Sequence, residues 1–245
     1  MDIKGKVAIL TGGARIGQAV ARELAQRGCA LAVTYRGSKG AAASTVEEAR
    51  AQGVAAEAFR VDLREENDVV ALVEKTIERF GRIDILLNMA SKYTSVPFSR
   101  FGARTWSEAV DLDARSSFLL AIKVAPHMKQ AGAGRIINFT DWLPVSARPR
   151  YSGYTLYYVA KSAVKGVTEA LALELAPEIL VNAIAPGPII PPDELSEDDN
   201  AKVIAATPLR RWGGAEEIAK AVLFLIETDF ITGECIRVDG GRHLY

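Results

Sequence analysis

A tyrosine and a lysine four positions apart, Tyr157 and Lys161, are the residues of this sequence best suited to move a proton. Residues four apart share one face of a helix, so the ammonium of Lys161 would lie near the phenol of Tyr157. A free phenol has a pKa of about 10, and a nearby cation lowers that pKa because it favours the phenolate. The pair therefore predicts an acid catalyst that works near neutral pH, provided that other reactive groups gather beside it.

A carboxylate, Asp141, closely follows the apolar run GRIINF, which has the composition of a buried strand. Such a residue is a helix cap, a loop residue in water, or a group placed against a substrate. The neighbouring Trp142 is either a substrate contact or a core side chain. The local sequence fits each alternative, so the choice depends on what else lies at that edge of the protein.

Short apolar runs alternate with helical patterns along the whole chain. The strands are expected at residues 6–10, 30–35, 55–60, 83–87, 135–139, 179–185 and 235–238. The helices, each with 3.6-residue periodicity, are expected at residues 17–27, 41–52, 65–80, 106–130, 157–175 and 215–226. Unbroken alternation of this kind predicts an α/β fold, one doubly wound parallel sheet with helices on both faces. We expect one domain over residues 1–245.

The composition narrows the possible partners. Thirty basic and thirty acidic residues give a net charge of zero, so no bulk field favours nucleic acid or an anionic membrane. No stretch has the roughly 20 apolar residues that cross a bilayer, and the first residues do not resemble a signal peptide. Two cysteines without a CxxC motif and two histidines predict no metal site. We expect a cytoplasmic protein with a small-molecule substrate.

A glycine-rich turn, TGGARIG at residues 11–17, follows the first expected strand and opens a helix. Glycines let the backbone approach a pyrophosphate, and a helix N-terminus offers free N–H groups. Ligands of an open parallel sheet bind beyond the carboxyl ends of its strands, so the ends of later strands join this site. The candidate cofactor-binding residues are Gly12, Arg15, Ile16, Gly17, Tyr35, Arg36, Ser38, Asp62, Leu63, Asn88, Ala90, Ser91, Lys161, Pro186 and Gly187.

The end of the second expected strand indicates which dinucleotide binds. An acid at this place would bind both ribose hydroxyls of NAD, whereas Arg36 and Ser38 suit a 2′-phosphate. Arg15 could join Arg36, and a solvated surface arginine is the alternative for either residue. Asp62, at the end of the third strand, is placed for the adenine amino group. We expect NADPH.

Five motifs occur in a characteristic order: TGGARIG, NMAS after the fourth strand, YxxxK at residues 157–161, VNAIAPGPI and ITGECIRVDGG. With them the chain resembles the short-chain dehydrogenases/reductases over essentially its whole length. That resemblance implies a seven-stranded Rossmann sheet, a nicotinamide cofactor and a tyrosine–lysine pair that protonates the substrate.

Within that family, NFTDWL and GYTLYYVAKSAVKG resemble the pteridine reductases, which have an aspartate where most members have a serine. The resemblance implies that Asp141 and Tyr157 protonate a dihydropterin or dihydrofolate and that Lys161 holds the nicotinamide ribose. It also implies that Ser91 and Tyr93 line the slot, with the pterin between nicotinamide and Tyr93. A ketone is disfavoured, because an ionised aspartate cannot donate a hydrogen bond as a serine does.

Two departures from the family pattern leave alternatives open. Gly12 and Gly17 are one residue closer than in the usual turn, so the turn must be rebuilt and Arg15 displaced. Asp111 is expected where many members have an asparagine that anchors a proton-relay water. The alternatives are a carbonyl or 3-oxoacyl reductase and a non-catalytic dinucleotide-binding sensor.

Two further expectations concern a lid and the assembly. The segment around residues 186–206 contains four prolines before residue 199, which predicts either a substrate lid or a plain surface connection. Apolar runs at residues 117–122 and 170–173 exceed what one sheet face requires, unless these helices are deeply buried. Together with the family resemblance, they predict a homotetramer.

Overall fold

The computed structural model describes residues 1–244, and within them seven strands form one sheet in the order β3-β2-β1-β4-β5-β6-β7. Every neighbouring pair is parallel. The predicted α/β fold is confirmed, and each expected strand is present close to its predicted place. The strands are β1 (Val7–Thr11), β2 (Ala30–Tyr35), β3 (Ala56–Arg60), β4 (Ile85–Asn88), β5 (Gly134–Phe139), β6 (Ile179–Pro186) and β7 (Cys235–Val238).

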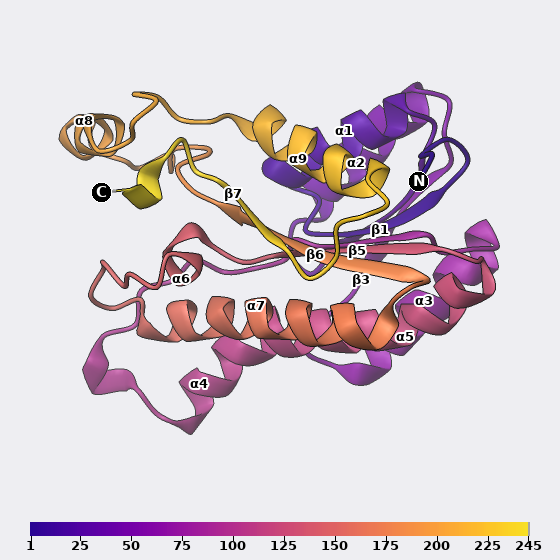
Figure 1. Cartoon of the computed structure of the whole chain (residues 1–245), viewed down its shortest axis with the longest axis horizontal. Helices are drawn as coiled ribbons and strands as arrows, with labels where there is room; N and C mark the ends of the chain where they lie inside the picture. The colour runs from indigo at the N-terminus through magenta and orange to yellow at the C-terminus, as the bar shows by residue number, and fades with distance from the viewer. Residues whose placement is uncertain (245) are drawn as a thin grey trace.

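Helices cover both faces of the sheet (Figure 1). On one face lie α1 (Ile16–Gln26), α2 (Lys39–Ala51) and α9 (Ala215–Glu227). On the other lie α3 (Glu66–Phe80), α5 (Ser116–Gln130) and α7 (Thr155–Leu175). Shorter helices gather toward the edge at which the strands end: α4 (Ala103–Val110), α6 (Trp142–Val145), α8 (Glu197–Ala205) and the turns η1 (Phe98–Arg100) and η3 (Arg242–Leu244).

Each face of the sheet has its own apolar core. The central strands are apolar at nearly every position because helices cover both of their faces. On β4, for example, Leu86 and Leu87 are both fully buried, and they belong to opposite cores. This double burial fixes the strand register, and with it the places where β1, β4 and β5 end.

The helix expected at residues 106–130 is not continuous. A π-helical turn, η2 (Asp111–Arg115), separates α4 from α5. Two serine hydroxyls bind carbonyl groups of this turn: Ser116 donates to the Leu112 carbonyl, and Ser117 to the Asp113 carbonyl at 2.7 Å. The turn buries the side chain of Asp113.

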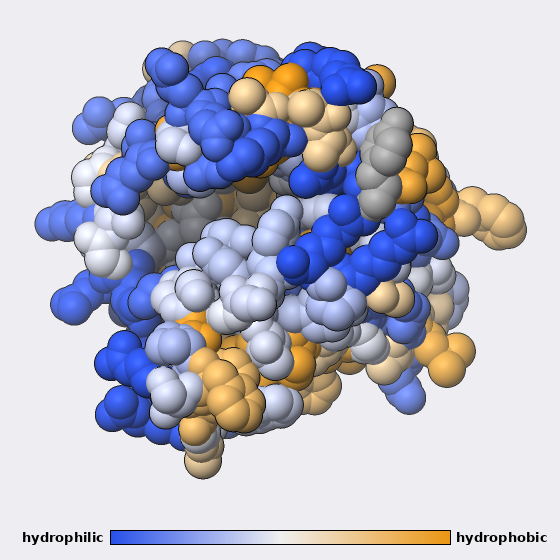
Figure 2. Space-filling model, turned by 90° about the vertical axis from the view of Figure 1, so that its left-hand side faces the viewer, coloured by the Kyte–Doolittle hydropathy of each residue, from blue (hydrophilic) through white to orange (hydrophobic). Residues whose placement is uncertain are grey.

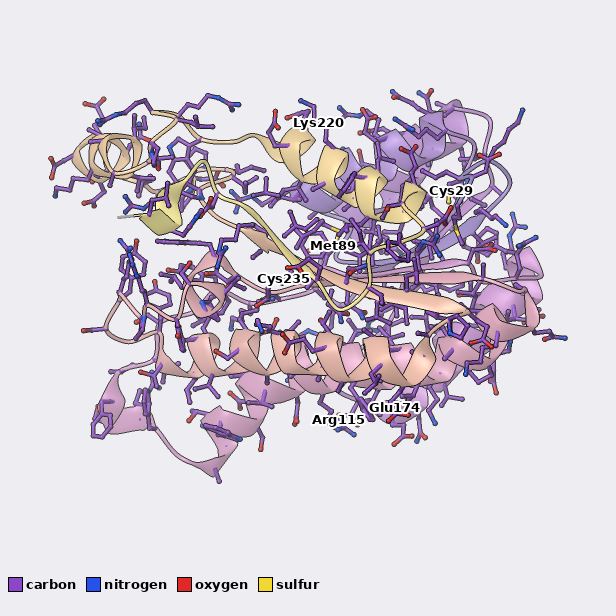
Figure 3. All side chains as sticks on the ribbon, viewed as in Figure 1. Cys29, Met89, Arg115, Glu174, Lys220 and Cys235 are labelled. Atoms are coloured by element: carbon purple, nitrogen blue, oxygen red, sulfur yellow. The ribbon has the colours of Figure 1, made fainter. Side chains whose placement is uncertain are left out.

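Three observations on residues 1–244 concern cysteine reactivity, membrane crossing and metal binding. Cys29 and Cys235 are free and lie in separate parts of the molecule (Figure 3). Burial raises the pKa of each thiol to about 12, so neither is a thiolate near neutral pH. Among residues 1–244, no helix is both long and apolar enough to pass through a membrane. Nor do three or more His, Cys, Asp or Glu side chains of these residues gather as metal ligands would.

Candidate active site

A cavity of about 450 Å³ opens at the carboxyl ends of β1, β2, β3 and β4. Figure 2 looks onto this edge of the molecule and shows it hollowed. The predicted cofactor residues in its wall are Gly12, Tyr35, Arg36, Ser38, Asp62, Leu63, Ala90 and Ser91. The remaining wall residues, which were not in the predicted set, are Gly13, Ala14, Thr34, Gly37, Ala42, Val61, Met89, Lys92 and Leu112.

The glycine-rich turn beside this cavity has a positive backbone φ at a residue other than glycine. Arg15 has a positive φ of 52°, and its guanidinium donates to the Pro191 carbonyl at 3.0 Å instead of pointing into the cavity beside Arg36. Gly17 packs directly on the turn, because a Cβ there would lie 2.0 Å from the Gly12 carbonyl oxygen. Ile16 and Gly17 thus form the start of α1 outside the cavity wall.

A threonine hydroxyl joins the turn to the neighbouring loop. Thr11, the last residue of β1, accepts hydrogen bonds from the backbone N–H groups of Met89 at 2.9 Å and Ala90 at 3.0 Å. Gly12 has a φ of 81°, and a Cβ there would already touch the Ala90 backbone at 3.4 Å. This close approach of two backbones creates the narrow, glycine-lined wall that a dinucleotide pyrophosphate requires.

The charged end of the cavity is formed by Arg36 with Asp62 and Arg64. The Asp62 carboxylate accepts from Arg64 Nε at 2.8 Å and lies 3.8 Å from Arg36 Nη1. The Arg64 guanidinium, above all, holds the pKa of Asp62 down at about 2, so this carboxylate stays ionised. Arg36 remains half exposed beside Ser38, and the two offer donors for an anionic group.

The two carboxyl oxygens of Asp141 accept hydrogen bonds from different partners. One carboxyl oxygen caps α6 by accepting from the Leu143 N–H at 2.9 Å, and the other accepts from the Tyr157 hydroxyl at 3.0 Å. Of the alternatives that the sequence left open, the helix cap is therefore present, and the second carboxyl oxygen faces Tyr157. Contact of Asp141 with a substrate stays a prediction.

Burial determines the acidity of this pair. It raises the pKa of Asp141, although the bonds from Leu143 and Tyr157 and the charge of Lys161 act in the opposite direction. Burial and then the negative charges of Asp141 and Asp113 raise the pKa of Tyr157 well above its ordinary value. The sequence predicted a lowered pKa for this phenol, and that prediction was wrong because it counted the lysine alone.

Lys161 is held in the interior by one hydrogen bond and one ion pair. Its ammonium donates to the Phe139 carbonyl at 2.8 Å and forms an ion pair with Asp113 Oδ1 at 3.0 Å. The carboxylate beside Lys161 is thus Asp113, two residues after Asp111. Both lie in the η2 turn, whose position the sequence pattern did not reveal. The place of Asp111 in a proton relay stays a prediction.

Three other predicted residues lie at strand ends beside the site and act as its supports. Asn88 is buried and donates to the Asn138 side chain at 2.8 Å, and Asn138 in turn donates to Thr168 on α7 at 2.9 Å. Pro186 ends β6, and the N–H of the following Gly187 donates to the Val238 carbonyl at 2.9 Å. These bonds fix the ends of the strands, and none of the three predicted residues lines the large cavity.

Tyrosine rings gather above the Tyr157–Asp141 pair. Tyr93 stacks on Tyr154 with ring centroids 4.4 Å apart and meets Tyr157 edge-on at 4.9 Å. Trp142 is only 6% exposed, and the guanidinium groups of Arg150 and Arg242 lie over its ring. Tyr93 therefore borders the Tyr157–Asp141 pair, whereas Trp142 is a buried side chain that lines neither described cavity.

Comparison with known proteins identifies the family. Residues 13–243 match the family described as enoyl-(acyl carrier protein) reductase. The chain is 34% identical to the 3-oxoacyl-(acyl-carrier-protein) reductase FabG of Staphylococcus epidermidis, over 98% of this chain and 99% of that one. The chain belongs to the short-chain dehydrogenase/reductase family.

Solved structures of this family agree with the assignment. A 7α-hydroxysteroid dehydrogenase in complex with NADH and 7-oxo glycochenodeoxycholic acid has a TM-score of 0.90 and 32% identity, covering 98% of this chain and 94% of that one. A blue fluorescent protein from a metagenomic library, in complex with NADPH, has a TM-score of 0.88 and 32% identity over 99% of both chains. Short-chain dehydrogenases/reductases bind nicotinamide cofactors, and the glycine-lined cavity fits such a group. The comparisons do not single out the pteridine reductases.

The packing of Gly17 on the turn gives a first prediction. In Gly17→Ala the new Cβ meets the Gly12 carbonyl, so the turn must move and the free energy of unfolding falls by about 1–3 kcal/mol. NADPH binding, measured by fluorescence titration, weakens with it. Gly37→Ala is the matched control, because a Cβ at this cavity residue meets no atom within 4 Å. Equal effects of the two substitutions would contradict the prediction.

Proposed function

We propose that this chain is an NADPH-dependent reductase that converts dihydropterins or dihydrofolate to their tetrahydro forms. The observation that carries the proposal is the 3.0 Å contact between the Asp141 carboxyl and the Tyr157 hydroxyl. It provides a two-residue proton source where most family members have a serine and a tyrosine. Tyr93, whose ring meets Tyr157 edge-on, supplies an aromatic surface for a flat heterocycle.

The chemistry divides between the cofactor and the side chains. A bound reduced nicotinamide supplies a hydride. When a C=N bond accepts a hydride at carbon, negative charge develops on the nitrogen, and a proton must reach that atom. Tyr157 is the donor, and Asp141 supports it through their hydrogen bond. Lys161 holds the positive charge of the site and would bind the nicotinamide ribose, as the family resemblance implies.

A carbonyl or 3-oxoacyl reductase is the second candidate, and the relatives favour it. FabG of Staphylococcus epidermidis is named as a 3-oxoacyl reductase, and the match to it spans almost the whole of both chains. The sequence argument against ketones assumed an ionised Asp141. Burial raises the pKa of this residue, and in its protonated form the carboxyl can donate to a ketone oxygen. Asp141 alone therefore does not exclude ketones.

The segment around residues 186–206 is proposed as a substrate lid. It contains α8, whose N-cap residue Ser196 accepts from the Asp199 N–H at 3.1 Å. Trp212 Nε1 donates to the Asn200 side chain on the same helix at 2.8 Å. Arg15 ties the preceding stretch to the cofactor turn through the Pro191 carbonyl. A lid in this place would cover the cleft from the side of α8.

A panel of substrates separates the two candidates. With NADPH, we expect turnover of dihydrobiopterin and dihydrofolate to exceed that of 3-oxoacyl thioesters and simple ketones, followed by cofactor absorbance. Asp141→Ala should lower pterin turnover about 100-fold or more, because it removes part of the proton source, and should leave NADPH affinity nearly unchanged. Turnover of 3-oxoacyl thioesters or ketones alone would establish the second candidate.

The preference for NADPH is proposed to rest on Arg36. Arg36→Ala should lower kcat/KM for NADPH about tenfold or more and change that for NADH little, because a hydrogen bond to a charged group contributes about 1.5–3 kcal/mol. Arg15→Ala is the matched control, since Arg15 bonds Pro191 and lies outside the cavity wall. If the Arg36 variant lost both cofactors equally, this role would be wrong.

A homotetramer built through α5 and α7 is proposed as the assembly. Phe118 and Ile122 on α5 and Leu173 on α7 are exposed, and Leu173 is 83% exposed. A second copy of this chain would cover these apolar side chains. Sedimentation equilibrium should give four chains, and Leu173→Glu should dissociate them because a carboxylate would be buried. A monomer at micromolar concentration would contradict the proposal.

A further inference from the structure

A second buried carboxylate, Asp113, lies beside the reactive pair. Its side chain and that of Lys161 are each 4% exposed, and their charged atoms are 3.0 Å apart. The η2 turn brings Asp113 there, and the Ser117 hydroxyl fixes the turn by donating to the Asp113 carbonyl. The ion pair thus forms where water is largely excluded, so the loss of either of its charges would have a large effect on the pKa of neighbouring groups.

The net charge of the cluster is the sum over four groups: Lys161, Asp113, Asp141 and Tyr157. Lys161 carries one positive charge and Asp113 one negative charge, so they cancel. If Asp141 were ionised beside a neutral Tyr157, the cluster would carry one net negative charge in a buried site, which is costly. With Asp141 protonated the cluster is neutral. An asparagine at position 113 would reverse this count, because an ionised Asp141 would then balance the lysine.

The other charged groups nearby do not alter the count. Lys92 and Glu108 line a smaller cavity of about 110 Å³ together with Asp113 and Tyr157, and their charges are opposite. Arg150 and Arg242 lie over the ring of Trp142, and Lys161 is the cation that lowers the pKa of Asp141. Tyr93, which meets Tyr157 edge-on, is a neutral phenol whose pKa burial raises.

We propose that Asp113 is a positioning residue that keeps the Tyr157–Asp141 pair fully protonated, so that Asp141 acts as a hydrogen-bond donor toward the substrate. This rests on the proposed function only in placing the pair at the reacting atoms, and it holds for a pterin or a ketone alike. Asp113 and Asp141 therefore form a functional couple in which one carboxylate sets the protonation of the other.

Burial raises the pKa of both Asp141 and Tyr157, and the Asp113 charge adds to the rise for Tyr157. Its effect on Asp141 follows from the charge balance of the cluster, in which the Lys161–Asp113 ion pair cancels its own charge.

The pH profile of turnover tests the couple. Activity that needs a protonated Asp141 is present at low pH and is lost as the pH rises through the pKa of this residue. Asp113→Asn removes a negative charge, lowers that pKa, and should move the alkaline loss of kcat/KM downward by about one pH unit or more. Asp111→Asn, in the same π-helical turn, is the matched control and should leave the profile unchanged.

The same substitution in an Asp141→Ser background shows through which residue Asp113 acts. Serine does not titrate in this range, so Asp141→Ser and the double variant should have superimposable profiles between about pH 5 and 9, with no alkaline loss. An unshifted profile for Asp113→Asn overturns the proposal. So does an equal shift in the serine background, because the charge would then act on Tyr157 alone.

An infrared measurement on the purified full chain tests the protonation of Asp141 without turnover. At neutral pH, the C=O stretching band of a protonated carboxylic acid should be present in the wild type and in Asp111→Asn. It should be missing in Asp141→Ser and strongly reduced in Asp113→Asn. A wild-type spectrum without an Asp141-dependent band overturns the inference, even if pterins are reduced. Conversely, the expected bands in a protein that reduces only ketones would leave the inference intact and reject the proposed substrate.

Discussion

A buried ammonium is the constraint on which the rest of the site depends. A lysine charge cannot remain in the interior without acceptors, and Lys161 finds them in the Phe139 carbonyl and the Asp113 carboxylate. These come from the end of β5 and from the η2 turn, while Lys161 itself is on α7. A single charge therefore ties three elements together, and the Thr140 hydroxyl adds a bond to the Lys161 carbonyl at 2.6 Å. Tyr157, one helical turn earlier, is positioned as a result.

The two halves of the site differ in whether backbone or side-chain atoms form them. The cofactor side is made largely of backbone, brought close by Gly12 and Gly17 and held by the Thr11 hydroxyl. The proton side is made of buried side chains whose charges interact strongly, such as Lys161 and Asp113. Steric fit governs the first half and the balance of charge governs the second, so substitutions in the two halves have different signatures.

Periodicity and spacing predicted the features that depend on local sequence. The seven strands follow from short apolar runs, and the pairing of Tyr157 with a helix-mate lysine follows from a four-residue interval. Features that depend on tertiary packing could not be predicted in this way. A π turn has no sequence signature comparable to proline or glycine, so the ion pair of Asp113 with Lys161 was not predicted. The direction of the Tyr157 pKa shift was missed because burial is a property of the folded chain.

The Arg15 bond to Pro191 links the glycine-rich turn to the stretch of chain that precedes α8. If this stretch belongs to the proposed lid, opening of the lid would pull on the turn that faces the dinucleotide. Release of the spent nucleotide and reopening of the cleft would then be coupled.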